Sequence, residues 1–292
     1  MSEPKEQVPF VVTKGYQLFA DLCDACRRFR SIGLGYGPPG TGKTESARQY
    51  AKWEHLEPFM PENLITFTGR SAVDGFFPYK PFTFSSAQAS TPLQECRTVL
   101  YTPPVSGSPG RIEKEVMTLF AAFSYVVEAA NEQNLREREF LITRRSSHLI
   151  ELLIVDEANR LKDAWIEQIR DIYDKGRFGL VLLGMPGLER RLSRAPQLYS
   201  RIGFAHQIKP MSEEETRFYL DRRWNHRVKP HSKEFTDQEA VTAIVRITGG
   251  NIRVLERLME QVEYVLLANP TVSTVTVEVV ETARQNLLLG PD

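Results

Sequence analysis

Apolar side chains along the chain follow two patterns that alternate with each other. Short apolar runs are typical of buried parallel strands, and they occupy residues 31–37, 96–104, 149–155 and 178–187. The segments between them repeat apolar residues at helical spacing, over residues 16–30, 43–53, 109–127 and 161–172. Strands that alternate with helices predict an α/β fold, a three-layer core around a parallel sheet.

The C-terminal part has the pattern of helices alone. Two capping boxes mark helix starts there, Ser212 with Glu215 and Thr236 with Glu239. Two further helices are expected after them, over residues 249–269 and 275–289.

These patterns predict two domains. We expect an α/β core over residues 1–210 and a small all-helical lid over residues 211–292. Within the core, residues 56–94 mix prolines with aromatic side chains and break both patterns. This irregular insertion either docks a partner or covers an edge of the sheet, and we favour the covering role because exposed aromatic clusters promote aggregation.

The segment GPPGTGKT fits the phosphate-binding pattern G-x-x-x-x-G-K-[ST], with a predicted strand before it and a helix after it. Backbone N–H groups of such a loop point at phosphate oxygens, and its glycines let the chain approach them closely. Lys43 would reach the β- and γ-phosphates of ATP, and Thr44 would hold Mg²⁺ through its hydroxyl. The predicted nucleotide-binding loop residues are Gly37, Pro38, Pro39, Gly40, Thr41, Gly42, Lys43 and Thr44.

Two carboxylates, Asp156 and Glu157, follow the apolar run at residues 149–155. In phosphoryl-transfer ATPases an aspartate at a strand end orients the Mg²⁺ shell, and a neighbouring glutamate polarises the attacking water. We therefore expect Asp156 to join Thr44 at the metal and Glu157 to be catalytic. The alternative is that the pair only caps a helix start.

Composition limits the other functions. The 37 basic and 37 acidic residues give a net charge of zero, so any DNA contact must come from a local stripe or from many copies acting together. Cys23, Cys26 and Cys96 lack the fourth ligand of a structural zinc site, and we read the first two as helix residues. No apolar run is long enough to span a membrane and no secretory segment begins the chain, so we expect a cytoplasmic protein.

Five segments, in this order, carry a resemblance to the AAA+ ATPases: GPPGTGKT, LLIVDEANRLK, GLVLLGMPGLERRL, YSRIG and GGNIRVLERL. The stretch from DEANRLK to GMPGL is similar to the TniB/TnsC-type transposition regulators, relatives of the MuB and IstB helper ATPases. The resemblance implies an ATPase that oligomerises as a ring or helical filament and marks double-stranded DNA. It also implies two protein partners, a transposase and a target-selection factor.

The resemblance assigns two arginines as well. Arg201 stands where such ATPases place an arginine that reaches the γ-phosphate of the neighbouring subunit, and Arg253 matches the sensor arginine of the lid. One position departs from the family pattern, because Met185 occupies the place of a polar sensor at the end of a strand. A thioether hydrogen-bonds water poorly, so we expect slow hydrolysis.

Other functions stay open. A replication initiator or loader of the same superfamily usually carries a winged-helix domain behind the lid, and the chain ends soon after its last predicted helix. A secretion-associated or signalling ATPase would carry an attached membrane or recognition domain. A nucleotide-locked scaffold would need no Glu157.

The DNA-binding candidates are arginines between core strands. They could also form a solvated face paired with Glu137 and Glu139, so both readings stand. We favour the last two of the five, Arg111, Arg136, Arg138, Arg144 and Arg145, because no acidic residue follows them before Glu151.

Overall fold

The computed structural model describes residues 10–61, 91–107, 109–131, 149–227, 238–272 and 274–287. The chain divides into two compact units. The α/β unit comprises Leu18–Gly37 and Lys43–Gln207, and the helical unit comprises Met1–Gln17, Pro38–Gly42 and Ile208–Asp292. The predicted boundary at residues 210 and 211 remains a proposal.

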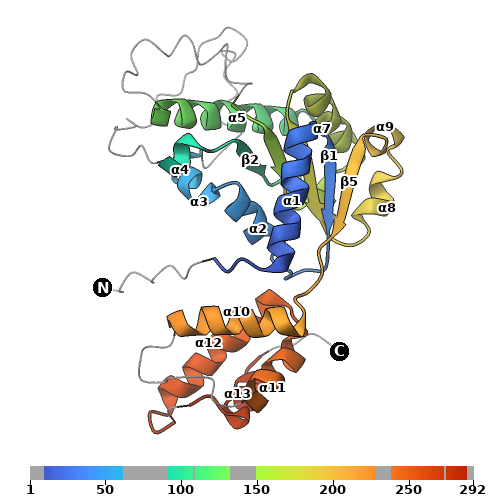
Figure 1. Ribbon diagram of the computed structural model, residues 1–292. Helices are drawn as coiled ribbons and strands as arrows, with labels where there is room; N and C mark the ends of the chain where they lie inside the picture. Colours follow the sequence, from blue (N-terminus) through green and yellow to red (C-terminus); the bar gives the residue numbers. More distant parts are fainter. Residues whose placement is uncertain are drawn as a thin grey trace. The chain divides into compact units, whose positions relative to one another are not determined.

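A five-stranded parallel sheet forms the centre of the α/β unit (Figure 1). Its strand order is β2-β3-β4-β1-β5, and each neighbouring pair is parallel, as the sequence predicted. The strands are β1 (Ile32–Tyr36), β2 (Thr98–Tyr101), β3 (Leu152–Val155), β4 (Gly179–Gly184) and β5 (Ile202–Gln207).

Four longer helices flank this sheet. They are α1 (Lys14–Phe29), α2 (Lys43–Tyr50), α5 (Pro109–Asn131) and α7 (Asp163–Lys175). Shorter helices lie at α3 (Trp53–Leu56), η1 (Glu57–Phe59), α4 (Thr91–Gln94), η5 (Ala158–Arg160), α8 (Leu188–Leu192) and α9 (Pro196–Tyr199). Residues 62–90, most of the predicted insertion, lie outside the described residues.

Helix α1 lies close against two strands because glycines leave room for it. A Cβ on Gly33 of β1 would come within 2.5 Å of Cys26 Sγ, and one on Gly179 of β4 within 2.3 Å of the Cys26 carbonyl oxygen. Cys23 and Cys26 are buried helix residues, as predicted. Leu18 on the same helix is 43% exposed, although the helical spacing of its apolar residues would place it with the buried Phe19 and Leu22.

Strand β5 was not predicted. Its residues alternate between half-buried and exposed, whereas all residues of β2, β3 and β4 are buried. Strand β5 is only partly covered, so it lacks the continuous apolar run of the other strands, whereas β2, the edge strand on the opposite side of the sheet, is buried throughout. Strand β3 is also shorter than the predicted run and begins at Leu152.

The helical unit contains α10 (Glu213–Arg227), α11 (Gln238–Thr248), α12 (Ile252–Ala268) and α13 (Val277–Gln285). Their apolar faces share one core that includes Leu220, Ile244, Leu258 and Val280. The capping box of α10 is confirmed, since the Ser212 N–H donates to Glu215 Oε2 at 3.0 Å and the Glu215 N–H to Ser212 Oγ at 3.2 Å. Thr236, the cap of the other predicted capping box, lies outside the described residues.

None of the helices that the structure describes has the length and apolar character to cross a membrane.

Candidate nucleotide site

The predicted phosphate loop connects β1 to α2. Its first residue is tied to the sheet, because the Gly37 N–H donates to the carbonyl oxygen of Gly184 at the end of β4, at 3.2 Å. Gly40 and Gly42 both have a φ of +81°. Residues with a Cβ rarely adopt this conformation, so both positions require glycine and the loop backbone has the form that the motif predicts.

Lys43 is the first residue of α2, and its side chain folds back along the loop. Its Nζ donates to the Gly37 carbonyl oxygen at 2.8 Å. An ammonium held there by a neutral carbonyl can exchange that oxygen for a phosphate oxygen, which gives a stronger, charge-assisted hydrogen bond.

Thr44 and Asp156 meet although 112 residues separate them in the chain. Thr44 Oγ1 donates to Asp156 Oδ2 at 2.7 Å. The aspartate is only 3% exposed, and its Oδ1 accepts the Glu157 N–H at 2.9 Å. The sheet brings the two residues together. Strands β1 and β3 flank β4 and run parallel to it, so their carboxyl ends lie at the same edge of the sheet.

These two oxygens fit Mg²⁺. A hydroxyl and a carboxylate in contact are hard oxygen ligands, and Mg²⁺ in nucleotide sites takes one or two protein oxygens, with phosphates and waters completing its octahedron. No cluster of three or more His, Cys, Asp or Glu side chains suited to a metal occurs within the described ranges. Thr44 and Asp156 would therefore hold the ion together with the nucleotide.

Glu157 has an unusual backbone, with φ at +54°. Its side chain is 38% exposed, and Oε2 lies 3.8 Å from Arg160 Nε and 3.5 Å from Asn159 Nδ2. A left-handed conformation at a residue with a long side chain costs energy and is concentrated at functional sites. Met185, which stands where the resemblance places a polar sensor, follows directly after β4 and is 41% exposed.

In the helical unit, the loop tip Pro38–Gly42 contacts the start of α12. Asn251 caps this helix, because its Oδ1 accepts the Val254 N–H at 3.2 Å, while its Nδ2 donates to the Pro39 carbonyl oxygen at 2.9 Å. A Cβ on Gly40 would lie 2.2 Å from Asn251 Oδ1. Sequence reasoning missed this role, although an Asn before a helix is a capping signal.

Arg253, the predicted sensor arginine, lies in the first turn of α12. Its backbone N–H donates to the Gly40 carbonyl oxygen at 3.3 Å. Its side chain is exposed and makes no hydrogen bond or ion pair within the part of the chain that the structure describes. The guanidinium is therefore available to a ligand.

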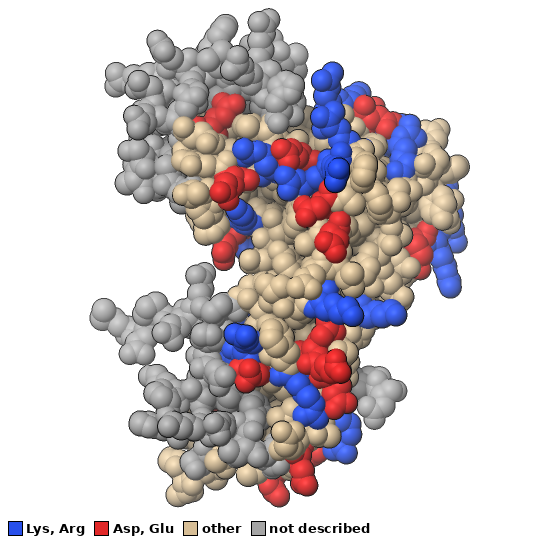
Figure 2. All heavy atoms as spheres, in the orientation of Figure 1, with Lys and Arg blue, Asp and Glu red and all other residues tan. Residues whose placement is uncertain are grey.

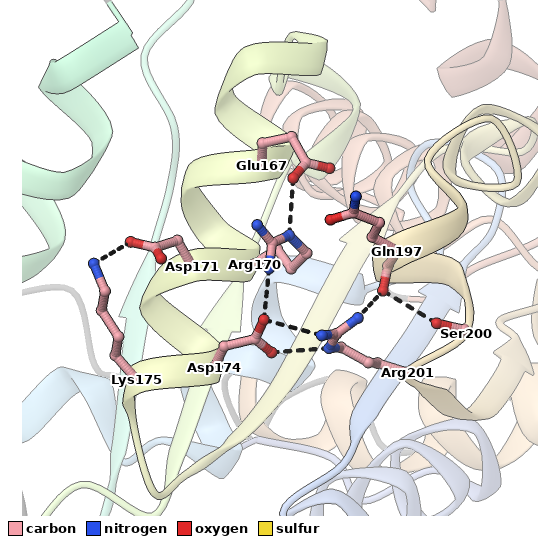
Figure 3. Close-up of polar contacts among 8 residues, drawn as sticks. All are labelled: Glu167, Arg170, Asp171, Asp174, Lys175, Gln197, Ser200 and Arg201. Carbon is pink, nitrogen blue, oxygen red and sulfur yellow. Dashed lines mark hydrogen bonds and ion pairs between the residues drawn. The ribbon is translucent and has the colours of Figure 1, made fainter.

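Arg201 lies between α9 and β5 (Figure 3). It precedes the last strand of the sheet, because β5 begins at the next residue. Both oxygens of Asp174 accept from its guanidinium, at 2.8 Å from Nε to Oδ1 and 3.1 Å from Nη2 to Oδ2. Sequence reasoning missed this partner, which stands 27 positions earlier at the end of α7.

Arg191, ten residues before Arg201, has partners of its own in the α/β unit. Arg191 donates through Nη1 to the Asn159 carbonyl oxygen at 2.8 Å and through Nη2 to the Leu161 carbonyl oxygen. It thus fixes the segment that follows the acidic pair.

Of the predicted DNA-binding arginines, only Arg111 lies within the described residues. Its Nε pairs with Glu115, a carboxylate only 4% exposed that also accepts the Tyr101 hydroxyl at 2.6 Å. This gives Arg111 a role in neutralising a buried charge, and contact with DNA remains a prediction. The structure gives no placement for the other four, Arg136, Arg138, Arg144 and Arg145.

Charges on the surface are mixed in sign. Figure 2 shows basic and acidic side chains next to one another over the described part of the face in view. This arrangement agrees with the neutral composition, and the described residues of this face form no large basic field.

The three cysteines are free and buried. Burial raises the pKa of the Cys26 thiol to about 12 and that of Cys96 to about 11, and it raises the pKa of Cys23 as well. A thiol with a raised pKa is a poor nucleophile at neutral pH, so these residues serve packing.

The comparisons with known proteins agree with this geometry. A family model described as "AAA domain" matches residues 27–192. A Staphylococcus aureus protein described as a potential ATP-binding protein is 33% identical in an alignment of 287 residues that covers 96% of this chain and 97% of that protein.

Two solved structures share the fold. The Aeropyrum pernix ORC1 protein in complex with DNA has a TM-score of 0.56 at 16% identity, covering 96% of this chain and 67% of that chain. The ORC2 protein of Aeropyrum pernix, solved in ADPNP-ADP complexes, has a TM-score of 0.56 at 12% identity, covering 99% and 72%.

The chain belongs to the AAA domain family of P-loop ATPases. Its α/β core with a phosphate loop and its C-terminal helices have the AAA fold.

Proposed function

We propose that this protein is an ATP-dependent regulator of transposition, a switch that assembles on double-stranded DNA with ATP bound and disassembles after hydrolysis. In that role it marks target DNA, recruits or activates a transposase and answers to a target-selection factor. The proposal joins the AAA family membership to the resemblance of the DEANRLK-to-GMPGL segment to transposition regulators.

The hydrogen bond between Thr44 and Asp156 is the observation that carries the ATPase part of the proposal. It brings the phosphate loop and the acidic strand end to one place, and a Mg²⁺ bound there would neutralise charge on the β- and γ-phosphates. Lys43 would bind the same phosphates, and Glu157, exposed at the strand end, would orient and polarise the attacking water. Arg201 of a neighbouring subunit would stabilise the charge on the transferred phosphoryl group.

Slow turnover fits a switch. Met185 cannot position a water as a polar sensor would, so the ATP-bound state would last long enough for a partner to read it. The ATP-binding name of the 33% identical relative supports the choice of nucleotide.

Double-stranded DNA is supported by the fold and by the resemblance. The ORC1 protein that shares the fold was solved with DNA, and this also favours a second candidate function, a replication-initiator or loader ATPase. We prefer the transposition regulator because the similar sequence segments are those of that group, whereas the likeness to the ORC proteins is one of fold at 16% and 12% identity.

The testing experiment is phosphate release from ATP, with and without duplex DNA, by the wild-type protein and by Glu157→Gln. We expect the wild type to release phosphate slowly, at a rate that differs with and without DNA. In the variant the rate should fall about 10²–10⁴-fold while ATP binding is retained. Nucleotide binding without release in the wild type would favour a nucleotide-locked scaffold instead. ATP-dependent insertion into a target plasmid by an added transposase would then separate the regulator from an initiator.

A further inference from the structure

The guanidinium of Arg201 is already bound within its own subunit. Asp174 takes two of its nitrogens, and Nη1 donates to the Gln197 carbonyl oxygen, which also accepts Ser200 Oγ at 3.2 Å (Figure 3). The paired side-by-side contact is the geometry in which arginine also binds a phosphate. Asp174 thus occupies the guanidinium surface that a γ-phosphate would need.

Asp174 has a second cation. Arg170, four residues earlier on α7, donates through Nη1 to Asp174 Oδ2 at 2.6 Å and through Nε to Glu167 Oε2 at 2.8 Å. If Arg201 left, Asp174 would keep Arg170 as its partner. Departure would therefore not strand an unpaired, partly buried carboxylate, which is the costly outcome when an ion pair is broken.

Arg201 is also reachable. Its side chain is 37% exposed and that of Asp174 is 28% exposed. A phosphate carries more negative charge than a carboxylate and offers more acceptor oxygens, so it can compete for Arg201 without unfolding of α9 or β5.

We propose that Asp174 is a positioning residue that holds Arg201 in the free subunit, and that the γ-phosphate of ATP in a neighbouring subunit takes Arg201 from it as subunits associate. This inference rests on the proposed function, in which Arg201 acts across a subunit interface. The free subunit then keeps its arginine occupied, and the cost of breaking the Asp174 pair raises the concentration at which active assemblies form.

The test compares Asp174→Asn with Asp171→Asn. Asparagine keeps the shape of Asp174 but removes its charge, so Arg201 is released more readily. Asp171 lies on the same helix and pairs with Lys175, away from Arg201, which makes its variant a matched control. Phosphate release per subunit and sedimentation are measured over a range of protein concentrations with ATP and duplex DNA.

We expect the half-maximal concentration for both activity and assembly to fall about two- to fivefold in Asp174→Asn, the change expected for one partly exposed ion pair. The control should match the wild type. A folded Asp174→Asn protein with the wild-type half-maximal concentration would overturn the inference. Arg201→Ala with wild-type hydrolysis in the assembled state would instead refute the role of Arg201 in the proposed function.

A second measurement needs no variant at Asp174. In wild-type protein labelled with ¹⁵N, the Arg201 Nε–H should exchange slowly with water in the free subunit and shift its resonance on assembly with ATP. Arg201→Lys identifies the signal. Fast exchange in the free subunit, or an unchanged resonance after assembly, would contradict the proposal even if Asp174→Asn failed to fold.

Discussion

The inner strands β1 and β3 and the edge strand β5 hold their candidate functional residues in different ways. Strands β1 and β3 lead into Lys43, Thr44 and Asp156, whose positions are fixed by hydrogen bonds within the α/β unit. Strand β5 follows Arg201, whose guanidinium is partly exposed and is bound by Asp174 and by the Gln197 carbonyl oxygen. The inner strands thus hold a candidate nucleotide site that is already assembled, while β5 carries an arginine whose partner, as we propose, can change.

The largest expected effect breaks the inner side of this comparison. Lys43→Ala removes the ammonium that would bind the β- and γ-phosphates, so ATP binding should weaken by more than about 100-fold. Titration with a fluorescent ATP analogue measures this affinity. Lys175→Ala, which removes an exposed lysine paired with Asp171, is the control and should bind as the wild type does.

Binding of the analogue by Lys43→Ala with wild-type affinity would show that the phosphate loop is not the nucleotide site. The substitution itself should not unfold the protein, since the Lys43 side chain is not part of the buried core.

Sequence patterns predicted β1 to β4 because burial on both faces leaves a continuous apolar run. They predicted the loop because GPPGTGKT fits a motif whose glycines, lysine and threonine each have a chemical role. They also placed Asp156 and Glu157 at the end of β3. The contact of Thr44 with Asp156 could be expected only through the resemblance and the known chemistry of such sites, since spacing along the chain says nothing of strand order.

Strand β5 and its contacts were not predicted. The residues IGFAHQ of β5 are neither continuously apolar nor cleanly alternating in polarity, so neither strand pattern applied. The pairing of Arg170 with Asp174 is a helical i, i+4 pair that the sequence could have given. The bond from Arg201 to Asp174 depends on where β5 packs, which local patterns do not encode.

A second prediction sharpens the comparison through stability. Leu182 in the middle of β4 is 1% exposed, so Leu182→Ala should lower the free energy of unfolding by about 2–5 kcal/mol. Phe204 on β5 is half-buried and its ring lies 6.1 Å from that of Phe29, itself 65% exposed. Phe204→Ala should therefore cost less than half as much as Leu182→Ala, although it removes a larger side chain.

Urea unfolding followed by circular dichroism measures both changes. An equal slope of the unfolding free energy against urea concentration in the two variants would show that only stability differs. Equal losses of stability would mean that β5 is as tightly packed as the inner strands. The contrast drawn between the two regions would then be wrong.

The smallest expected effect is a dependence on pH that arises in β5. Partial burial lowers the pKa of His206 below its ordinary value of 6.5. The unfolded chain therefore binds a proton at this residue more readily than the native protein does. The contribution of His206 to stability is thus complete above pH 6.5 and declines as the pH falls below it.

His206→Gln removes this titration while keeping a polar side chain. The melting temperature should fall between pH 7.5 and pH 5.5 in both proteins, and the fall should be larger in the wild type by about 1–3 °C. An equal fall in both proteins would show that the pKa of His206 is the same in the native and the unfolded protein.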